Sequence, residues 1–219
     1  MTSEERMNAV RQTYDRVAQD YAREISGELE HKPLDRALLD CFAELAGAQG
    51  VVADIGCGPG NVGRYLHDRG VEVVGLDLSP VMVTTARRLN PEMTFEVGNM
   101  LALDVPDGAW AGIVAFYSLI HLTPADLPRA CGEFYRTLSD GGRTLVAFHI
   151  GDEHVHRDEW WGHEVDLDAY FFALDDVANA LGSAGFTLEA RIEREPDQSV
   201  EYPSRRGYIL AHKPDAPTG

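Results

Sequence analysis

The chain has 219 residues, with 36 Asp and Glu against 19 Lys and Arg, so its formal net charge is −17 with histidine counted as neutral. This length favours a single domain that can bury a core without disulfide or metal support. The excess of acid argues against a protein that binds nucleic acid, because a phosphate lattice rewards a surplus of Lys and Arg.

Three scattered cysteines, Cys41, Cys57 and Cys131, form no CxxC pair, which favours free thiols in a reducing compartment. The first residues lack the basic and then apolar profile of a signal peptide, and no apolar run approaches the roughly 20 residues of a membrane helix. We therefore expect a soluble cytoplasmic protein without a membrane partner, either a monomer or a homodimer.

The first 46 residues carry helical spacing. Apolar side chains recur at intervals of three and four on one face of a helix, at Tyr14, Val17, Ala18, Tyr21 and Ala22. A second helix is expected over 33–45, with proline near its start and Gly47 after its end. These two helices predict an N-terminal helical cap over residues 1–46.

From residue 47 onward, short apolar runs alternate with helical segments. Strands are expected at 51–55, 71–76, 93–97, 112–116 and 144–149, with helices at 61–68, 80–89 and 124–138. After a helix over 175–185, the runs 187–194 and 207–212 lie too close together for a helical crossover and predict an antiparallel hairpin. This alternation is typical of an α/β fold, a doubly wound sheet with helices on both faces.

The expected organisation is one domain over residues 1–219. Its parts are the helical cap, a cofactor-binding core at 47–150, a segment without a clean period at 151–172, a final helix and hairpin at 173–213, and a loose tail at 214–219. Ligands of such sheets bind at the carboxyl ends of the strands.

A glycine-rich loop follows the first buried strand: Asp54-Ile55-Gly56-Cys57-Gly58-Pro59-Gly60. Glycines permit an unusual φ and a close approach of ligand to backbone, and the helix that follows offers free N–H groups. Asp77 ends the second strand, where an acid can accept hydrogen bonds from both hydroxyls of a ribose. A tight turn followed by an ordinary acid is the alternative, but the ordered set favours a ligand site.

Residues 58–63 also match the GxGxxG fingerprint of dinucleotide-binding proteins. The register of this match is wrong, because the strand runs directly into Gly56 and not into Gly58. An NAD(P)-dependent oxidoreductase is therefore kept only as an alternative.

The ordered motifs VVADIGCGPGNVGRYL, GLDLSP, EVGNML and AFYSLIHL resemble those of class I S-adenosylmethionine-dependent methyltransferases that act on small molecules. The similarity covers roughly residues 10–150 in motif order. It implies a seven-stranded, mostly parallel sheet whose last strand is antiparallel. It also implies that S-adenosylmethionine lies over the glycine loop.

Carried over position by position, the resemblance places the glycines against methionine and ribose, Asp54 near the amino group and Asp77 at the ribose hydroxyls. Asn99 stands where the family usually has Asp, and its carbonyl oxygen can still accept from the adenine amino group. The full set of expected cofactor residues is Tyr21, Asp54, Gly56, Cys57, Gly58, Gly60, Asp77, Leu78, Met82, Asn99, Met100 and Phe116.

His121, just beyond the fourth strand, is the candidate general base, unless it only packs its loop. The segment 149–163 is expected to act as a substrate lid, with a surface insertion as the alternative. A metal site at His154 and His156 is a further alternative, and we expect none. The expected substrate-binding residues are Tyr14, His149, His154, Trp160 and Trp161.

Arg205 and Arg206, beside the final strand, could clamp a carboxylate, although such residues are more often solvated. The sequence favours an enzyme that moves a methyl group from S-adenosylmethionine to an oxygen or nitrogen of a small-molecule acceptor. A non-catalytic S-adenosylmethionine-binding module is another alternative. The negative field favours a small neutral or cationic acceptor over a bulky anion such as tRNA or DNA.

Overall fold

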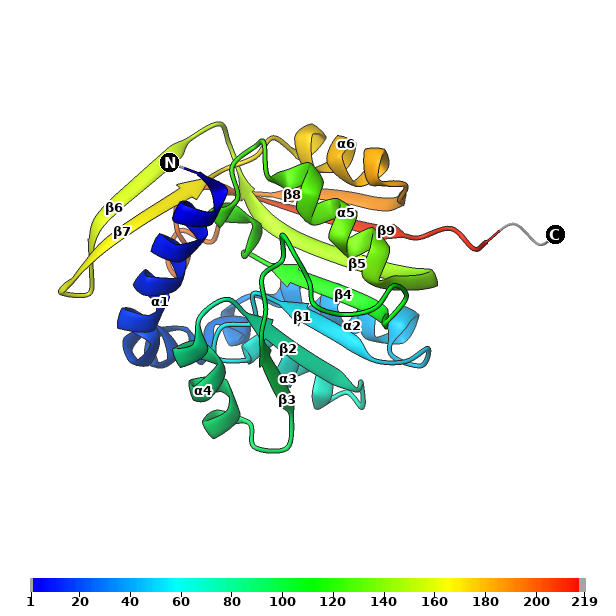
Figure 1. Cartoon of the computed structure of the whole chain (residues 1–219), viewed down its shortest axis with the longest axis horizontal. Helices are drawn as coiled ribbons and strands as arrows, with labels where there is room; N and C mark the ends of the chain where they lie inside the picture. The colour runs from blue at the N-terminus through cyan, green and yellow to red at the C-terminus, as the bar shows by residue number, and fades with distance from the viewer. Residues whose placement is uncertain (1, 217–219) are drawn as a thin grey trace.

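The computed structural model describes residues 2–216, and seven of its strands form one sheet in the order β3-β2-β1-β4-β5-β9-β8 (Figure 1). Strand β9 runs antiparallel to both of its neighbours, β5 and β8, and the other neighbouring strands are parallel. The expected sheet is therefore confirmed. Its strands are β1 Val52–Ile55, β2 Val73–Asp77, β3 Thr94–Val97, β4 Trp110–Phe116, β5 Leu138–Ile150, β8 Thr187–Arg194 and β9 Arg205–His212.

Helices cover both faces of the sheet, as expected. Buried side chains of α2, α3 and α4, such as Leu39, Leu66 and Val83, belong to one apolar cluster, whereas Phe134 of α5 and Leu181 of α6 belong to the other. The helices are α1 Ser3–Ile25, α2 Pro33–Ala46, α3 Asn61–His67, α4 Pro80–Leu89, α5 Leu127–Thr137 and α6 Leu174–Ala184, with short 3-10 helices η1 Glu28–His31 and η2 Leu119–His121.

Local sequence explains where these elements begin and end. Strands β1 and β4 are buried along their whole length because they lie at the centre of the sheet. Ser79 caps α4 by accepting a 3.0 Å hydrogen bond from the Met82 amide, and Pro80 takes the first helical position. Gly185, with φ of 111°, ends α6.

The segment 151–172, whose sequence shows no clean period, forms a second, two-stranded sheet. Strands β6 His154–Trp160 and β7 His163–Tyr170 pair antiparallel and lie beside α1 (Figure 1). Trp161 and Gly162 both have positive φ, 52° and 81°, as a tight hairpin turn requires. The hairpin is held to α1 by a 2.8 Å contact between His163 Nε2 and Asp20 Oδ2.

Two boundaries differ from the sequence-based expectation by three residues or more. Helix α5 begins at Leu127 rather than at residue 124, and β5 begins at Leu138, well before the expected residue 144. Residues 217–219 of the expected loose tail lie outside the described residues. Among residues 2–216, no helix combines the length and apolar character needed to cross a membrane.

Candidate functional site

Two adjoining cavities open at the carboxyl ends of β1, β2 and β4. The first, here called the glycine-loop cavity, is bounded by the loop after β1, the end of β2 and the inner side of α1. The expected site residues that line it are Tyr14, Tyr21, Gly56, Gly58, Asp77, Leu78, Asn99, Met100, Phe116 and His121. The fold thus gathers ten side chains and glycines that lie far apart in the sequence.

The glycines of the loop serve different purposes. A Cβ on Gly60, whose φ is 93°, would lie 2.9 Å from both the Phe95 ring and the Asn90 amide, so this glycine is required by packing. A Cβ on Gly58 would meet only the Tyr21 ring, at 3.6 Å. Gly58 therefore leaves a strip of backbone that a ligand can approach closely.

Asp77 presents a carboxylate to the same cavity. Its Oδ2 accepts a 2.8 Å hydrogen bond from the Gly58 amide, and its Oδ1 accepts a 2.9 Å bond from the Ser79 amide. Burial raises the pKa of Asp77 to about 6 although these two amides favour the ionised form. A largely ionised carboxylate beside the exposed Gly58 backbone can accept hydrogen bonds from a ligand that carries neighbouring hydroxyl groups, such as a ribose.

Four of the expected cofactor residues do not line the cavity. Asp54 lies under the loop and accepts a 2.8 Å hydrogen bond from the Gly63 amide in α3, and burial raises its pKa to about 7. Cys57, Gly60 and Met82 are buried beneath the loop and α4. Their roles toward a cofactor remain predictions.

Of residues 58–63, which carry the overlapping GxGxxG match, Gly58 alone lines this cavity. Its last residue, Gly63, lies inside α3 and uses its amide to bind Asp54. The strand β1 ends at Ile55, so the turn that faces the cavity is built by Gly56 and Gly58.

The second cavity, here called the outer cavity, has a volume of about 280 Å³. Its further walls come from the β6–β7 hairpin, from Lys32 before α2, and from the 195–204 loop between β8 and β9. The residues that line both cavities are Tyr14, Tyr21, Phe116, Tyr117 and His121.

Tyr14 and His121 form a hydrogen-bonded pair at this junction. The Tyr14 hydroxyl lies 2.7 Å from His121 Nε2, and His121 Nδ1 lies 3.2 Å from the backbone carbonyl of Asp168. A carbonyl can only accept, so Nδ1 carries the hydrogen and Nε2 accepts from Tyr14. Burial lowers the pKa of His121 to about 4 and raises the pKa of Tyr14, so both groups are neutral at pH 7.

The hairpin places its two tryptophans differently. Trp160 lines the outer cavity and packs edge-to-face against Tyr14 and Tyr21, with ring centroids 5.9 Å and 5.6 Å away. Trp161 stacks on the outer side of Trp160 and is 39% exposed. The structure therefore brings Trp160 to the cavity and leaves Trp161 outside it.

The histidines of this region also separate. His149 lines the outer cavity and lies 2.6 Å from the Ser204 hydroxyl, and burial together with Arg206 and Lys32 lowers its pKa to about 3. His154 and His156 are exposed on the hairpin, where both contact Asp168 Oδ1. Within residues 2–216, no three His, Cys, Asp or Glu side chains come together as a metal site.

The structure adds cavity residues that the sequence did not reveal. Tyr117 follows β4 with a φ of 55°, and its hydroxyl donates a 3.0 Å hydrogen bond to buried Asp35. Lys32 and Glu201 line the outer cavity from segments far away in the chain. Tyr117 lies within the AFYSLIHL run, but a positive φ at a non-glycine residue and a long-range contact leave no pattern in the sequence that marks these three as cavity residues.

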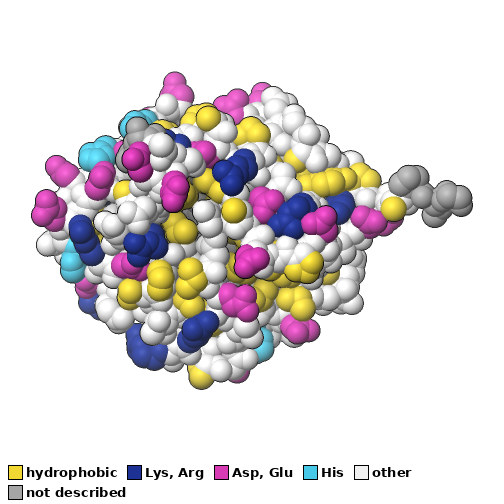
Figure 2. Space-filling model, viewed as in Figure 1, with side chains coloured by type: hydrophobic (Ala, Val, Ile, Leu, Met, Phe, Trp, Pro, Cys, Tyr) yellow, Lys and Arg dark blue, Asp and Glu magenta, His cyan; other side chains and the backbone are white. Residues whose placement is uncertain are grey.

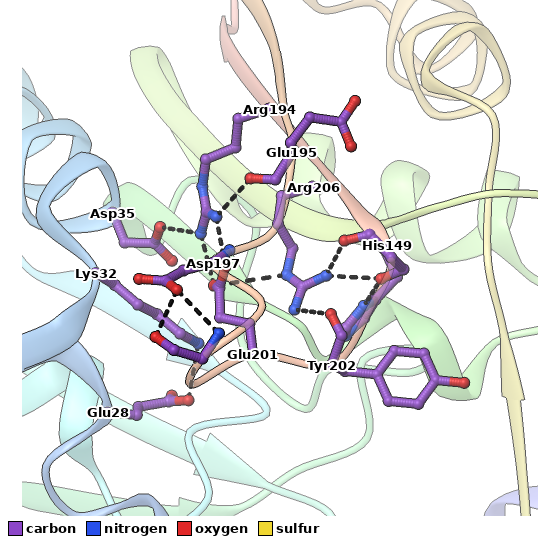
Figure 3. Close-up of polar contacts among 12 residues, drawn as sticks. Glu28, Lys32, Asp35, His149, Arg194, Glu195, Asp197, Glu201, Tyr202 and Arg206 are labelled. Carbon is purple, nitrogen blue, oxygen red and sulfur yellow. Dashed lines mark hydrogen bonds and ion pairs between the residues drawn. The ribbon is translucent and has the colours of Figure 1, made fainter.

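Figure 3 shows the charged groups of this region. Arg194 binds both Asp35 and Glu201, at 3.0 Å and 2.6 Å, and Arg206 lies on the other side of Glu201. Arg206 is only 2% exposed, whereas Arg205 is exposed and pairs with Glu193. Of the two arginines that the sequence singled out, only Arg206 lines the outer cavity.

Comparison with known proteins agrees with this geometry. Residues 52–142 match the family described as "Methyltransferase domain". The chain is 32% identical to malonyl-[acyl-carrier protein] O-methyltransferase of Serratia marcescens over 73% of its residues, and 37% identical to demethylmenaquinone methyltransferase of Thermus thermophilus over 43%. It spans 63% and 45%, respectively, of the length of these two relatives.

A solved structure shares the fold over nearly the whole chain. It is the complex between the Haloferax volcanii Trm112 methyltransferase activator and the putative methyltransferase. One chain of that complex superposes with a TM-score of 0.70 at 23% identity, covering 92% of this chain and 97% of the other.

Proposed function

We propose that this chain is a class I S-adenosylmethionine-dependent methyltransferase that transfers a methyl group from S-adenosylmethionine to an oxygen or nitrogen of a small-molecule acceptor, a proposal that the match to the methyltransferase domain and the similarity to named methyltransferases support. The observation that carries the proposal is the junction of the two cavities. One cavity has the bare glycine edge and the Asp77 carboxylate, the other has room for an acceptor, and Tyr14 and His121 face both.

The glycine-loop cavity supplies the groups that would hold the cofactor. Asp77 would accept from the ribose hydroxyls, and Leu78 and Met100 would contact the adenine. Asn99 Oδ1 already accepts a 2.9 Å hydrogen bond from the Leu101 amide and keeps a second lone pair for the adenine amino group. S-adenosylmethionine itself supplies a methyl group activated by the sulfonium.

The protein then needs to position the acceptor and receive its proton. Holding two reactants in line can supply about 7–11 kcal/mol at the extreme. The hydroxyl oxygen of Tyr14 can take the proton that the methyl acceptor loses, while the Tyr14 hydroxyl passes its own proton to His121 Nε2. The hydroxyl oxygen and Nε2 lie 2.7 Å apart. A pKa of about 4 makes His121 a weak base, so the pair suits an acceptor whose own proton is acidic.

The proposal is tested in two stages. Calorimetric titration should first show saturable binding of S-adenosylhomocysteine at one site, and a screen of small molecules with methyl-labelled S-adenosylmethionine should then yield a labelled product. No saturable binding would refute the proposal. Tight binding without transfer to any acceptor would favour a non-catalytic module.

Once an acceptor is known, replacing His121 with Ala should lower kcat about 10²–10⁴-fold, the usual contribution of a general base. Tyr14→Phe should lower kcat in the same direction, because it removes the relaying hydroxyl. The wild-type kcat should be flat from pH 6 to 8, since a pKa of about 4 keeps His121 neutral throughout.

His154→Ala is the matched control, because that imidazole is exposed on the hairpin and outside the cavity. It should leave kcat unchanged. If His121→Ala behaves like His154→Ala, His121 only packs its loop.

A further inference from the structure

The charged side chains that line the outer cavity reverse the balance of the whole chain. Acids outnumber bases 36 to 19 overall, yet the cavity is lined by three cations, Lys32, Arg157 and Arg206, and by two carboxylates, Glu28 and Glu201. Lys32 Nζ and the Arg206 guanidinium carbon lie 4.8 Å and 5.6 Å from the centre of the Tyr117 ring. We call Lys32 and Arg206, the two cations beside the Tyr117 ring, the cationic end.

Both carboxylates of the cavity already accept hydrogen bonds from donors within the protein. Glu28 pairs with Lys32 at 2.9 Å. Glu201 accepts from Arg194 at 2.6 Å and 2.7 Å and from the Asp197 amide at 2.7 Å. Burial raises the pKa of Glu201, but the hydrogen bonds from Arg194 and Asp197 bring it down to about 2, so this carboxylate stays ionised.

Arg206 is the buried cation of this cavity, and its charge is poorly matched. Its Nη1 and Nη2 donate to neutral acceptors, the Ser204 hydroxyl and carbonyl and the Tyr202 carbonyl. Its Nε has no hydrogen-bond partner among residues 2–216, and Glu201 Oε1 lies 3.8 Å from it. A guanidinium that is 2% exposed and shares its carboxylate with Arg194 leaves uncompensated positive charge at the cavity wall.

We propose that the acceptor is a compact aromatic carboxylic acid whose carboxylate is bound at the cationic end and is not the methylated group. The inference rests on the proposed function, since it names the occupant of the same outer cavity. Counted over the whole cavity, three cations against two carboxylates suit one negative charge and not a diphosphate.

The rest of the cavity fits an aromatic body. Tyr14, Tyr21 and Trp160 form one wall, and Phe171 and Tyr202 lie on another side. A volume of about 280 Å³ is at the lower end of the range for small-molecule sites, which favours one or two rings.

The position of the carboxylate follows from which residues line which cavity. Lys32 and Arg206 line the outer cavity alone, whereas Tyr14 and His121 line both cavities. The group that faces the cofactor and the proton acceptor is therefore a different part of the acceptor from its acidic group.

The test compares an acid with its neutral isostere on protein saturated with S-adenosylhomocysteine. Calorimetric titration should show that 1-naphthoate binds at least tenfold more tightly than 1-naphthamide. Lys32→Gln should weaken naphthoate at least fivefold and leave naphthamide unchanged. Glu28→Gln should strengthen naphthoate, because it removes the anion that pairs with Lys32.

These variants are chosen because Lys32 and Glu28 lie at a helix start and a short 3-10 helix, so their loss does not open the buried Arg194–Glu201 network. Equal affinity for the acid and the amide, or a Lys32→Gln variant that binds naphthoate normally, would overturn the inference. So would inorganic pyrophosphate that binds more tightly than naphthoate with the same dependence on Lys32. If S-adenosylhomocysteine fails to bind, the proposed function fails instead, and naphthoate titrated alone still tests the cationic end.

Discussion

Burial controls the charge of the single carboxylate on which the cofactor assignment depends. Asp77 ends β2 at the cavity, where it keeps two backbone amides as donors, yet burial still raises its pKa to about 6. Ribose hydroxyls would add donors to the ionised form. Cofactor binding should therefore depend on pH close to neutrality.

Lowering the pH from 7.5 to 5.5 should weaken the binding of S-adenosylhomocysteine. At a pH above its pKa of about 6, the Asp77 carboxylate is ionised and can accept hydrogen bonds from the ribose hydroxyls. At a lower pH the carboxyl group is protonated, and its proton occupies an oxygen that a ribose hydroxyl would otherwise bind. Calorimetry at several pH values measures the change in Kd.

Asp77→Asn is the control for this pH dependence. This variant should bind S-adenosylhomocysteine at least tenfold more weakly at pH 7.5, and its Kd should change less with pH. The part of the pH dependence that the variant loses is the part that Asp77 causes. Any slope that remains reports other groups such as Asp54, whose pKa is about 7. A variant with unchanged affinity would remove the ribose assignment.

The sequence could predict the residues whose chemistry is local. Gly56, Gly58 and Asp77 sit at the ends of strands that apolar runs mark clearly, and the structure places them at one cavity. The presence of Lys32 and Tyr117 in the outer cavity could not be predicted in this way. It depends on long-range packing, on the left-handed backbone conformation of Tyr117 and on the loop between β8 and β9 that completes the cavity.

At the scale of elements, the turn between β1 and α3 combines a ligand-facing strip with a tightly packed corner. Gly60 precedes α3 in the left-handed region, and Phe95 and Asn90 from neighbouring elements leave no room for a Cβ there. The close packing around Gly60 fixes the angle at which α3 leaves the sheet. It thereby also fixes the position of the Gly58 backbone that faces the cavity.

Gly60→Ala should destabilise the protein by about 1–3 kcal/mol, because a Cβ would be strained at a φ of 93° and would lie 2.9 Å from two neighbours. Gly132→Ala in α5 is the opposite control, since its Cβ would meet nothing within 4 Å. That variant should gain about 0.5–1 kcal/mol from helix propensity. Urea unfolding measures both, and equal effects would contradict the role assigned to Gly60.

The β6–β7 hairpin shows why one element escaped prediction. Strand β7 alternates well, with Val165 and Leu167 buried and Glu164 and Asp166 exposed. Strand β6 is exposed on both sides for most of its length, and a register shift between Arg157 and Glu159 breaks its pairing. A period of two was therefore visible in only half of the hairpin.

At the scale of the whole molecule, the charge of −17 is spread over the surface. Figure 2 shows acidic side chains scattered over one face among fewer Lys and Arg. The global field favours neutral or cationic ligands, whereas the outer cavity gathers cations. The net charge of a chain therefore does not determine the sign of a buried site.

Raising NaCl from about 10 to about 300 mM should raise the Tm, because the Debye length falls from roughly 30 Å toward 6 Å and screens the repulsion among surface acids. Differential scanning calorimetry measures the shift. Choline chloride should have the same effect if screening is the cause, whereas an effect of Na⁺ alone would indicate a bound ion. A Tm that falls with salt would mean that surface ion pairs outweigh the repulsion.

The place of β9 in the sheet has a consequence for how the chain folds. This strand follows all others in sequence but lies between β5 and β8, and its Tyr208 hydroxyl binds Asp35 across 173 positions. The outer cavity, whose wall contains Arg206, thus needs both ends of the chain, whereas the residues that line the glycine-loop cavity all lie between Met7 and Leu122. Because such distant closures are slow, we expect refolding protein to acquire its cofactor pocket before it can distinguish one acceptor from another.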